Sequence, residues 1–139
     1  MISIIQKYEG CKLQAYRCPA GKWTIGWGNT SYPDGSPVKP NDIITKEYAD
    51  ALLLDYVMKN IYPVFQKIPY DLTLDQRRAV ASLVYNVGTQ AFLRSKLYKA
   101  ICNKEYAEIC RQWDFGFKQN LKGLFKRRTE ELYLFCKDL

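Results

Sequence analysis

The sequence predicts an α+β fold, and three observations support that prediction. The chain starts with a short helix-like stretch, continues through a segment in which glycine and proline separate short β-prone runs, and ends in a long part with helical periodicity. Its 139 residues are enough to bury one core, and a composition of 47% hydrophobic and 25% charged residues is that of a globular protein. We therefore expect one domain in which a small sheet leans on helices.

The N-terminal part is predicted to form a helix and then the sheet. The helix is expected over residues 2–8, where apolar side chains recur at helical spacing. Glu9 falls on the same apolar face, and Gly10 is a natural stop for the helix. Residues 16–40 are typical of a small antiparallel sheet with tight turns, because glycines and prolines interrupt runs such as KWTIGWG. A sheet of this size cannot bury a core alone, so it must pack against the helices.

The rest of the chain is predicted to be helical. Thr45 is a good N-cap for the helix KEYADALLLDYVMKN. Thr73 and Gln76 form a capping box that opens the helix LDQRRAVASLVYNV. Pro63 is expected to break the chain between these two helices, and Gly88 is expected to stop the second one.

The C-terminal helices raise the question of a buried arginine. A short helix is expected over residues 106–113, and a last one from roughly Leu121 to Phe135. The apolar stripe of the last helix consists of Leu121, Leu124, Phe125, Leu132 and Phe135. Arg128 falls on this stripe, and a buried arginine needs an anionic partner, for which Glu131 is the local candidate and Glu9 the distant one. The alternative is that the Arg128 side chain reaches solvent along its stem.

The net charge of +7 limits the classes of partner. Basic chains favour polyanions such as nucleic acid, anionic membrane surfaces and acidic cell-wall polymers, although a solvated cationic surface is the plain alternative. The sequence has neither a zinc-finger spacing nor an aromatic RNA-binding signature, so we expect no nucleic acid partner. No apolar run approaches the roughly 18 residues of a membrane span, and the start MISIIQKYEG is too short and too quickly charged for a signal peptide.

Five cysteines and no histidine restrict the redox and metal chemistry. The odd count and irregular spacing argue against a disulfide framework. Without histidine or a CxxC pair, no metal site and no cofactor are expected, and most of the thiols are interpreted as small core side chains. Cys11 lies seven residues before Cys18, and a reversible disulfide between them would block the Cys18 thiol until it is reduced.

A motif near the N-terminus gives the strongest indication of function. In EGCKLQAYRCPAGKWTIGWGNT, a glutamate is followed after eight residues by a cysteine and after five more by a threonine, namely Glu9, Cys18 and Thr24. This stretch resembles the N-terminal motif of the phage-type lysozymes, the endolysins of glycoside hydrolase family 24, in which the second position is aspartate or cysteine. The segments QRRAVASLVYNVG, FLRSKL and GLFKRRTEEL are similar to later family segments in the same order, so the resemblance covers nearly the whole chain.

The resemblance implies a two-lobed lysozyme-like fold with a cleft between a small sheet lobe and a mainly helical lobe. In one lysozyme domain of residues 1–139, the sheet lobe would span about residues 10–44 and the helical lobe about residues 62–139, with a helix over residues 45–61 between them. The implied partner is peptidoglycan, hydrolysed at the β-1,4 bond between N-acetylmuramic acid and N-acetylglucosamine. We expect the protein to be a monomer.

The resemblance also assigns roles to single residues. Glu9 would be the general acid, because a glycosidic oxygen leaves poorly unless it is protonated and partial burial helps a carboxyl group to keep its proton. Arg128, or its neighbour Arg127, looks like the family's arginine that pairs with this glutamate. Ser95 and Phe92 match a stretch near the family's glycan cleft and would bind substrate, although an N-cap serine and a core phenylalanine fit the sequence equally well.

Cys18 stands where most glycosidases have a second carboxylate, and its role stays open. It could act as a general base or anion through a lowered pKa, position a water together with the Thr24 hydroxyl, or attack the anomeric carbon. A purely structural role as a small buried thiol is a further alternative. Asn29 is a second departure, because family members often carry a histidine after G-x-G and asparagine cannot titrate. Trp23 and Trp27 could stack on sugar, with one of them expected in the core.

The expected function is therefore that of a phage or prophage endolysin that degrades peptidoglycan to lyse its host. It would be made in the bacterial cytoplasm and would reach the cell wall in the periplasm by holin-dependent release. A lytic transglycosylase acting on the same bond is one alternative, and it would leave 1,6-anhydro ends where a hydrolase leaves reducing ends. A non-catalytic module that binds the cell wall or nucleic acid is another, and a secreted toxin or effector with the same chemistry is a third.

Overall fold

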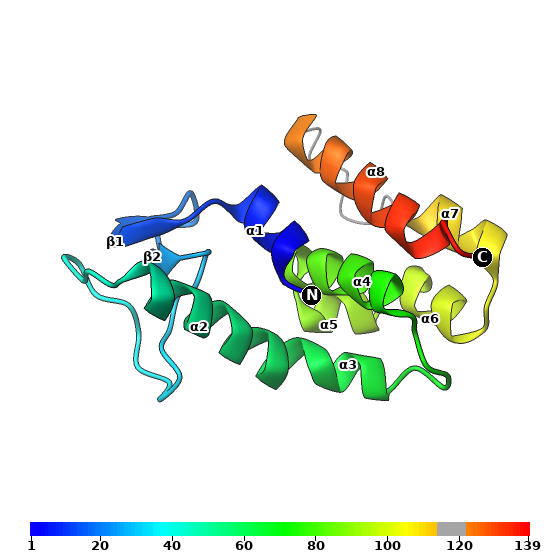
Figure 1. Ribbon diagram of the computed structural model, residues 1–139, viewed down its shortest axis with the longest axis horizontal. Helices are drawn as coiled ribbons and strands as arrows, with labels where there is room; N and C mark the ends of the chain where they lie inside the picture. The colour runs from blue at the N-terminus through cyan, green and yellow to red at the C-terminus, as the bar shows by residue number, and fades with distance from the viewer. Residues whose placement is uncertain (114–121) are drawn as a thin grey trace. The chain divides into compact units, whose positions relative to one another are not determined.

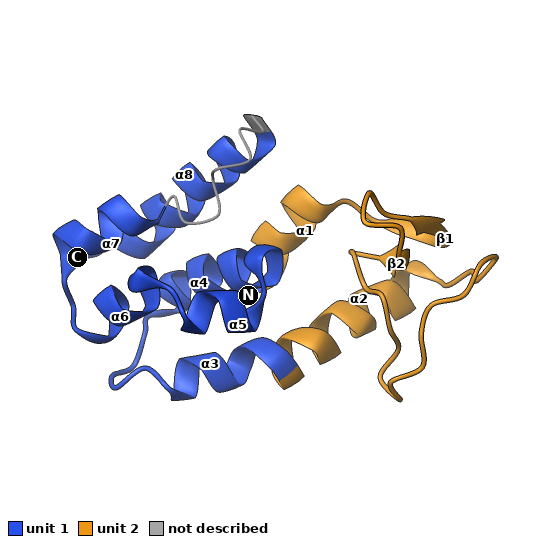
Figure 2. Cartoon of the chain, turned by 180° about the vertical axis from the view of Figure 1, so that it is seen from behind, with its two compact units in different colours: residues 1, 60–139 blue, residues 2–59 orange. Residues whose placement is uncertain are grey.

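The computed structural model describes residues 1–113 and 122–139, and within them it confirms the predicted α+β architecture (Figure 1). Leu121, which the sequence placed in the last helix, lies outside the described residues. The chain divides into two compact units, residues 2–59 and residue 1 with residues 60–139 (Figure 2). We call them the sheet unit and the helical unit. In the described ranges, no helix combines the length and the apolar composition that a membrane crossing requires.

The sheet unit begins with α1 (Ser3–Glu9) and an antiparallel hairpin of β1 (Lys12–Arg17) and β2 (Trp23–Gly26). The first helix and the small sheet were both predicted, but β1 starts earlier than the sequence indicated. The reason is the short connection after α1, in which Gly10 adopts a φ of 68° and turns the chain directly into the strand. This left-handed region is open to glycine at little cost, so the helix stop and the strand start nearly coincide.

The second helix of the sheet unit is α2 (Lys46–Tyr56). The Thr45 hydroxyl accepts a hydrogen bond from the backbone N–H of Tyr48 at 3.1 Å, which confirms the predicted N-cap. The buried face of α2 packs against β2. The core cluster of the unit consists of Ile25, Val38 and Leu52. Four partly buried side chains pack against it, namely Ala15, Trp23, Tyr32 and Ile44.

The helical unit contains α3 (Tyr62–Gln66), α4 (Leu74–Val87), α5 (Thr89–Leu93), α6 (Lys96–Cys102), α7 (Tyr106–Gln112) and α8 (Lys122–Cys136). A π-helical segment, η1 (Val57–Ile61), leads from α2 into α3. The prediction that Pro63 breaks the helical path is wrong. Pro63 lies in the first turn of α3, where its missing N–H and its fixed φ are tolerated.

The helices α4 and α8 pack against each other in the helical unit (Figure 1). At the start of α4, the Thr73 hydroxyl accepts the Gln76 N–H at 3.1 Å and the Gln76 side chain accepts the Thr73 N–H at 3.0 Å, which confirms the capping box. On α8 the predicted apolar stripe is correct for Phe135, which is buried, but wrong for Phe125, which is 65% exposed. Helical spacing groups side chains on one face but does not indicate how far a partner helix covers that face.

Candidate active site

The candidate site in the sheet unit is built around the turn between β1 and β2. Cys18 follows the last residue of β1, and its backbone N–H donates to the carbonyl of Lys22 at 2.9 Å. Gly21 donates to the carbonyl of Cys18 at 2.8 Å, which closes a β-turn with Pro19 at the position that favours a fixed φ. Gly21 has a φ of 84°, which other residues rarely adopt. The backbone therefore holds Cys18 in place at the start of a tight turn.

Hydrogen-bond donors surround the Cys18 side chain and change its acidity. Hydrogen bonding from the Lys22 backbone lowers the pKa of Cys18 most, partial desolvation opposes it, and the Ala20 backbone and the Thr24 hydroxyl lower the pKa further. Thr24 comes from β2 and is 3% exposed, and its hydroxyl also lies 3.1 Å from the carbonyl of Lys22, to which it can donate. The turn thus favours the thiolate, which is the basic and nucleophilic form of cysteine.

Tyr16 connects this thiol with Glu9. Tyr16 pairs with Thr24 across the hairpin, so the two side chains lie on the same face of the sheet. Burial raises the pKa of Tyr16, and the negative charges of Glu9 and Cys18 raise it further. Glu9 and Cys18 are therefore the two acidic groups whose charges act on Tyr16, and Thr24 is its partner across the strands. The sequence analysis did not include Tyr16, and the cross-strand register is the signal that finds it.

Glu9 is the last residue of α1 and is half-buried. Ile4 and Ile5, about one turn earlier in the same short helix, are buried, and Ile5 lies on the same face as Glu9. Because the helix ends at Gly10, the carboxyl group lies where α1 gives way to β1. This position leaves part of Glu9 open to solvent while its backbone is fixed, which suits a group that must exchange a proton with a substrate. Its role as general acid stays a prediction.

Two further predicted site residues lie in the helical unit and have structural partners there. Ser95 is the N-cap of α6, because its hydroxyl accepts the N–H of Tyr98 at 3.1 Å, and it also donates to the carbonyl of Phe92 at 2.6 Å. The Phe92 side chain is fully buried, with its ring centroid 5.6 Å from that of Tyr98. These are the structural roles that the sequence left open for both residues. Their contribution to substrate binding stays a prediction.

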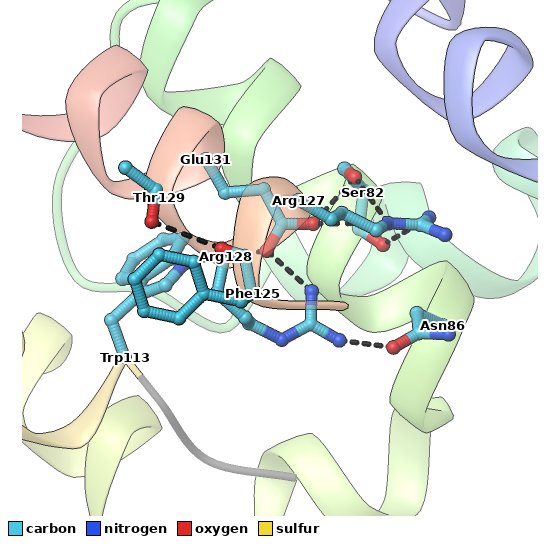
Figure 3. Close-up of polar contacts among 8 residues, drawn as sticks. All are labelled: Ser82, Asn86, Trp113, Phe125, Arg127, Arg128, Thr129 and Glu131. Atoms are coloured by element: carbon cyan, nitrogen blue, oxygen red, sulfur yellow. Dashed lines mark hydrogen bonds and ion pairs between the residues drawn. The ribbon is translucent and has the colours of Figure 1, made fainter. Parts of the chain in front are cut away.

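A buried ionic cluster joins α8 to α4 in the helical unit (Figure 3). Its centre is the carboxylate of Glu131, which is 0% exposed. The carboxylate accepts hydrogen bonds from Arg128 Nη1 at 2.6 Å, Ser82 Oγ at 2.5 Å, Arg127 Nε at 3.3 Å and Trp113 Nε1 at 3.3 Å. Burial raises the pKa of Glu131, whereas Arg128, the Ser82 hydroxyl and Arg127 oppose that rise.

Arg128 is 2% exposed, so the alternative in which its side chain reaches solvent is wrong. Its contact with Glu131 is the local pairing that the sequence suggested, and its other terminal nitrogen donates to Oδ1 of Asn86 on α4. The pairing of Arg128 with Glu9 and its role toward substrate stay predictions. The sequence analysis did not identify Arg127 as part of this cluster, although it is as deeply buried as its neighbour and also donates to the Ser82 carbonyl at 2.9 Å.

Asn29 and the two tryptophans of the motif lie in the sheet unit. Asn29 is 5% exposed, and its Nδ2 donates to the Leu52 carbonyl at 3.5 Å. Its Oδ1 has no hydrogen-bond partner among the described residues. Trp27 is buried and donates from Nε1 to Asp50 at 2.8 Å, whereas Trp23 is only partly buried. The expectation that one of the two tryptophans belongs to the core is therefore confirmed.

All five cysteines are free thiols in the structure, so Cys11 and Cys18 are not joined by a disulfide. The thiols differ in acidity. In contrast to Cys18, burial raises the pKa of Cys136 to about 11, and Cys110 close to it adds to the rise. In the described part of the chain, no group of three or more Cys, Asp or Glu side chains is arranged to hold a metal ion.

Comparison with known proteins identifies the family to which this arrangement corresponds. A family profile described as Phage lysozyme matches residues 6–131, which include Glu9, Cys18, Thr24 and Arg128. The chain belongs to the phage lysozyme family. Among its relatives, an endolysin of Acyrthosiphon pisum secondary endosymbiont phage 1 is 35% identical over 139 residues, which cover 95% of this chain and 92% of that protein.

Solved structures of similar proteins confirm the lysozyme-like fold. The endolysin from Escherichia coli O157:H7 phage FAHEc1 matches with a TM-score of 0.86 at 28% identity, over 99% of this chain and 91% of that one. The muramidase domain of SpmX from Asticaccaulis excentricus matches with a TM-score of 0.81 at 26% identity, over 97% of this chain and 93% of that one. The family recognised from the motif is therefore confirmed, and the chain is a lysozyme-type glycoside hydrolase.

Proposed function

We propose that this phage lysozyme hydrolyses the β-1,4 bond between N-acetylmuramic acid and N-acetylglucosamine in peptidoglycan, with Glu9, Cys18 and Thr24 as its catalytic residues. Family membership supports the substrate class. The observation that supports the residue assignment is the group around Tyr16, where the charges of Glu9 and Cys18 both act on one phenol. The sheet unit thereby offers a carboxyl group and a hydrogen-bonded thiol to the same reaction.

Glu9 acts as the general acid. Its proton goes to the glycosidic oxygen, which becomes O4 of the departing N-acetylglucosamine as the bond to C1 of N-acetylmuramic acid breaks. Protonation matters because positive charge develops at C1 in an oxocarbenium-like transition state, and the leaving oxygen would otherwise depart as an alkoxide. The half-buried position at the end of α1 allows the carboxyl group to reach a substrate while its backbone stays fixed.

Cys18 and Thr24 act on the attacking water. Of the three catalytic roles open to Cys18, we favour that of general base, because the hydrogen bonds that lower the pKa of Cys18 stabilise its thiolate. The thiolate accepts a proton from water as the water oxygen bonds to C1. The Thr24 hydroxyl interacts with both the Cys18 side chain and the Lys22 carbonyl, so it is placed to orient the thiolate and the water. Attack from the face opposite the leaving oxygen inverts the anomeric centre.

The proposed biological setting is the lysis of a bacterial host by a phage or prophage. The protein would be made in the bacterial cytoplasm and would reach the cell wall in the periplasm by holin-dependent release. The endolysin relative supports this setting, and the net charge of +7 favours association with an anionic wall. We further propose that the protein acts on peptidoglycan as a monomer and without a nucleic acid partner.

Lysis of outer-membrane-permeabilised Gram-negative cells tests the proposed function. We expect the wild type to clear the suspension in the presence of reductant, and Glu9→Gln to lose activity by about 100-fold or more, because the general acid is absent. The matched control is Glu47→Gln, which alters an exposed carboxylate on α2 and should leave the rate unchanged. Full activity of Glu9→Gln, or no lysis by the wild type, would contradict the proposal.

The role of Cys18 is tested separately through the products. We expect Cys18→Ser to be slow, because a serine hydroxyl is too weakly acidic to supply the anion, and Cys18→Asp to restore the rate. NMR of the fresh product should show the inverted anomer if Cys18 is the base. A retained anomer would instead assign Cys18 as the nucleophile, and 1,6-anhydro ends would mean that the protein is a lytic transglycosylase.

A further inference from the structure

A hollow in the sheet unit lies apart from the residues that the proposed function uses. It has a volume of about 570 Å³ and is lined by residues 32–34, Ser36, the segment 42–44 and Tyr48. All of these residues belong to the sheet unit, and none is among the predicted catalytic residues. Its size falls within the range of pockets that hold small ligands.

Internal hydrogen bonds brace the loop that forms the hollow. The Tyr32 hydroxyl donates to Oδ2 of Asp42 at 2.6 Å, and the backbone N–H of Lys39 donates to the same oxygen at 2.9 Å. Oδ1 of Asp34 accepts both the backbone N–H and the hydroxyl of Ser36, at 2.9 and 2.6 Å. A hollow held in this way is largely formed before a ligand arrives, which reduces the entropy cost of binding.

Two tyrosines supply an aromatic wall. The rings of Tyr32 and Tyr48 lie nearly parallel, with an angle of 14° between their planes and 6.4 Å between their centroids. Tyr48 is 42% exposed, and Ile43 beside it is 74% exposed. The negative face of an aromatic ring attracts C–H groups that carry slight positive charge, as the flat face of a pyranose does. The wall therefore offers stacking surface for a sugar ring.

The polar groups of the hollow select the charge of its ligand. Two aspartates and no basic residue line it. The Tyr32 hydroxyl lowers the pKa of Asp42 most, and the Ser36 hydroxyl lowers the pKa of Asp34 most, so both are ionised near neutral pH. The hydrogen bonds found among the described residues leave Asp42 Oδ1 and Asp34 Oδ2 open to accept sugar hydroxyls. Two lysines act on this lining from outside it, because Lys59 Nζ donates to the Pro33 carbonyl at 3.3 Å and the charge of Lys39 lowers the pKa of Asp42. The hollow is therefore rich in acceptors without a large net charge, which suits the hydroxyl groups of a neutral sugar.

We propose that this hollow is a second carbohydrate site, which holds a neutral N-acetylhexosamine of a glycan strand by stacking on Tyr48 and by hydrogen bonds to Asp42 and Asp34. The proposal rests on the proposed function, because peptidoglycan is the glycan that such a site would meet. A second attachment point on the same polymer raises the effective concentration of the strand near the catalytic residues.

The test is a titration of the non-lytic Glu9→Gln protein with the β-1,4-linked trimer of N-acetylglucosamine, followed by amide NMR. We expect shifts at Tyr32, Ile43 and Tyr48, and binding at these peaks about fivefold weaker in Tyr48→Ala. Tyr48→Phe keeps the ring and should keep the binding. Tyr106→Ala is the matched control, because Tyr106 is 45% exposed, close to the exposure of Tyr48, but lies in the helical unit.

The outcomes separate this proposal from the proposed function. Shifts confined to the peaks around Cys18 and Thr24, unchanged by Tyr48→Ala, would overturn the second site and leave the catalytic assignment intact. Shifts at the hollow in a protein whose wild type lyses no cells would support the site and contradict the proposed function. If Asp42→Asn melts like the parent protein but no longer shows the trimer-induced shifts at the hollow, the proposed hydrogen bonds between Asp42 and the sugar would be supported. No shift anywhere at millimolar trimer would overturn the site.

Discussion

Two side chains, one in each unit, are surrounded by hydrogen-bond donors and yet differ in what they can do. Cys18 in the sheet unit receives hydrogen bonds from the backbone of its own turn and from the Thr24 hydroxyl, and it remains partly exposed. Glu131 in the helical unit receives four hydrogen bonds and is 0% exposed. Donors stabilise a negative charge in both places, but only the partly exposed group can exchange a proton with water. This difference suits the role that we propose for Cys18 as a base and a stabilising role for Glu131.

The thiols of the two units show the same contrast. The pKa of Cys18 is lowered from 9.0, mainly by hydrogen bonding from the Lys22 backbone, whereas burial raises the pKa of Cys136 to about 11. The two residues are chemically identical in the unfolded chain. Their surroundings alone make the Cys18 thiol easier to ionise and the Cys136 thiol harder to ionise.

The largest effect is expected from Glu131→Gln, which breaks the buried cluster. The substitution leaves the guanidinium groups of Arg127 and Arg128 buried without their carboxylate, and removing one partner of a buried ion pair costs about 3–5 kcal/mol of stability. Urea unfolding measures the loss. Glu105→Gln is the control, because Glu105 is exposed and makes no side-chain cap hydrogen bond. A loss below about 1 kcal/mol would show that the cluster does not hold α8 to α4.

The next effect is a difference in alkylation rate between Cys18 and Cys136. Their pKa values lie more than two units apart, below 9.0 and at about 11, so their thiolate fractions near neutral pH differ by more than about 100-fold. The less basic thiolate is intrinsically the slower nucleophile, which reduces this ratio about tenfold. We expect Cys18 to react with iodoacetamide at least about tenfold faster, as measured by peptide mass spectrometry. The rates should converge in urea, and equal rates in the folded protein would contradict the contrast.

A smaller effect is expected from Thr24→Val, which removes one donor from the Cys18 side chain. The change should raise the pKa of Cys18, so the alkylation rate should reach half its maximum at a higher pH than in the wild type. The alkaline shift should also appear in the rising limb of the lysis profile if the thiolate is the base. Thr30→Val, at an exposed position of the same unit, is the control. If the pH of half-maximal alkylation does not change, the lowered pKa of Cys18 comes from the backbone donors of the turn alone.

Features that depend on neighbours in sequence were predictable. The caps at Thr45 and Thr73 were correct, because each involves an N–H only three residues away. The effect of Pro63 was not predicted correctly, because it depends on where a helix restarts after the π-helical segment. Phe125 was placed inward from its spacing, but whether a face is covered depends on tertiary packing that spacing does not describe.

The same distinction holds for the candidate site. Glu9 and Cys18 could be proposed because a family motif fixes their spacing, whereas Tyr16 joins them through the cross-strand register with Thr24. Register depends on how two strands pair and is not visible in a single stretch of sequence. The burial of Arg127 was not predicted, for a related reason. Adjacent residues on a helix point in different directions, so helical spacing predicted only one buried arginine, and it is Ser82 on α4 that also engages Arg127.

The smallest effect is expected at a partly exposed counterpart of the Glu131 cluster. Asp75 on α4 contacts Arg78 at 2.8 Å and Lys137 at 2.7 Å, with its side chain still 19% exposed. The Lys137 and Arg78 side chains lower the pKa of Asp75, and Asp75 in turn raises the pKa of Lys137. The stabilising contribution is therefore present above the ordinary carboxyl pKa of 3.8 and is lost as the pH falls through the lower folded value. The part that comes from Lys137 is also lost as the pH rises beyond 10.5 through the raised pKa of Lys137, whereas the contact with Arg78 remains.

Thermal unfolding of Asp75→Asn over this pH range measures the contribution. The variant should be slightly less stable than the wild type between the two limits and should match it at the acidic end. At the alkaline end the difference should shrink but persist, because Arg78 stays charged and still contacts Asp75. Added salt should reduce the difference, because partly exposed pairs are screened by ions and by water. A loss as large as that of Glu131→Gln would mean that burial is not what separates the two carboxylates. A difference that persists unchanged at acidic pH would show that Asp75 acts through its shape and not through its charge.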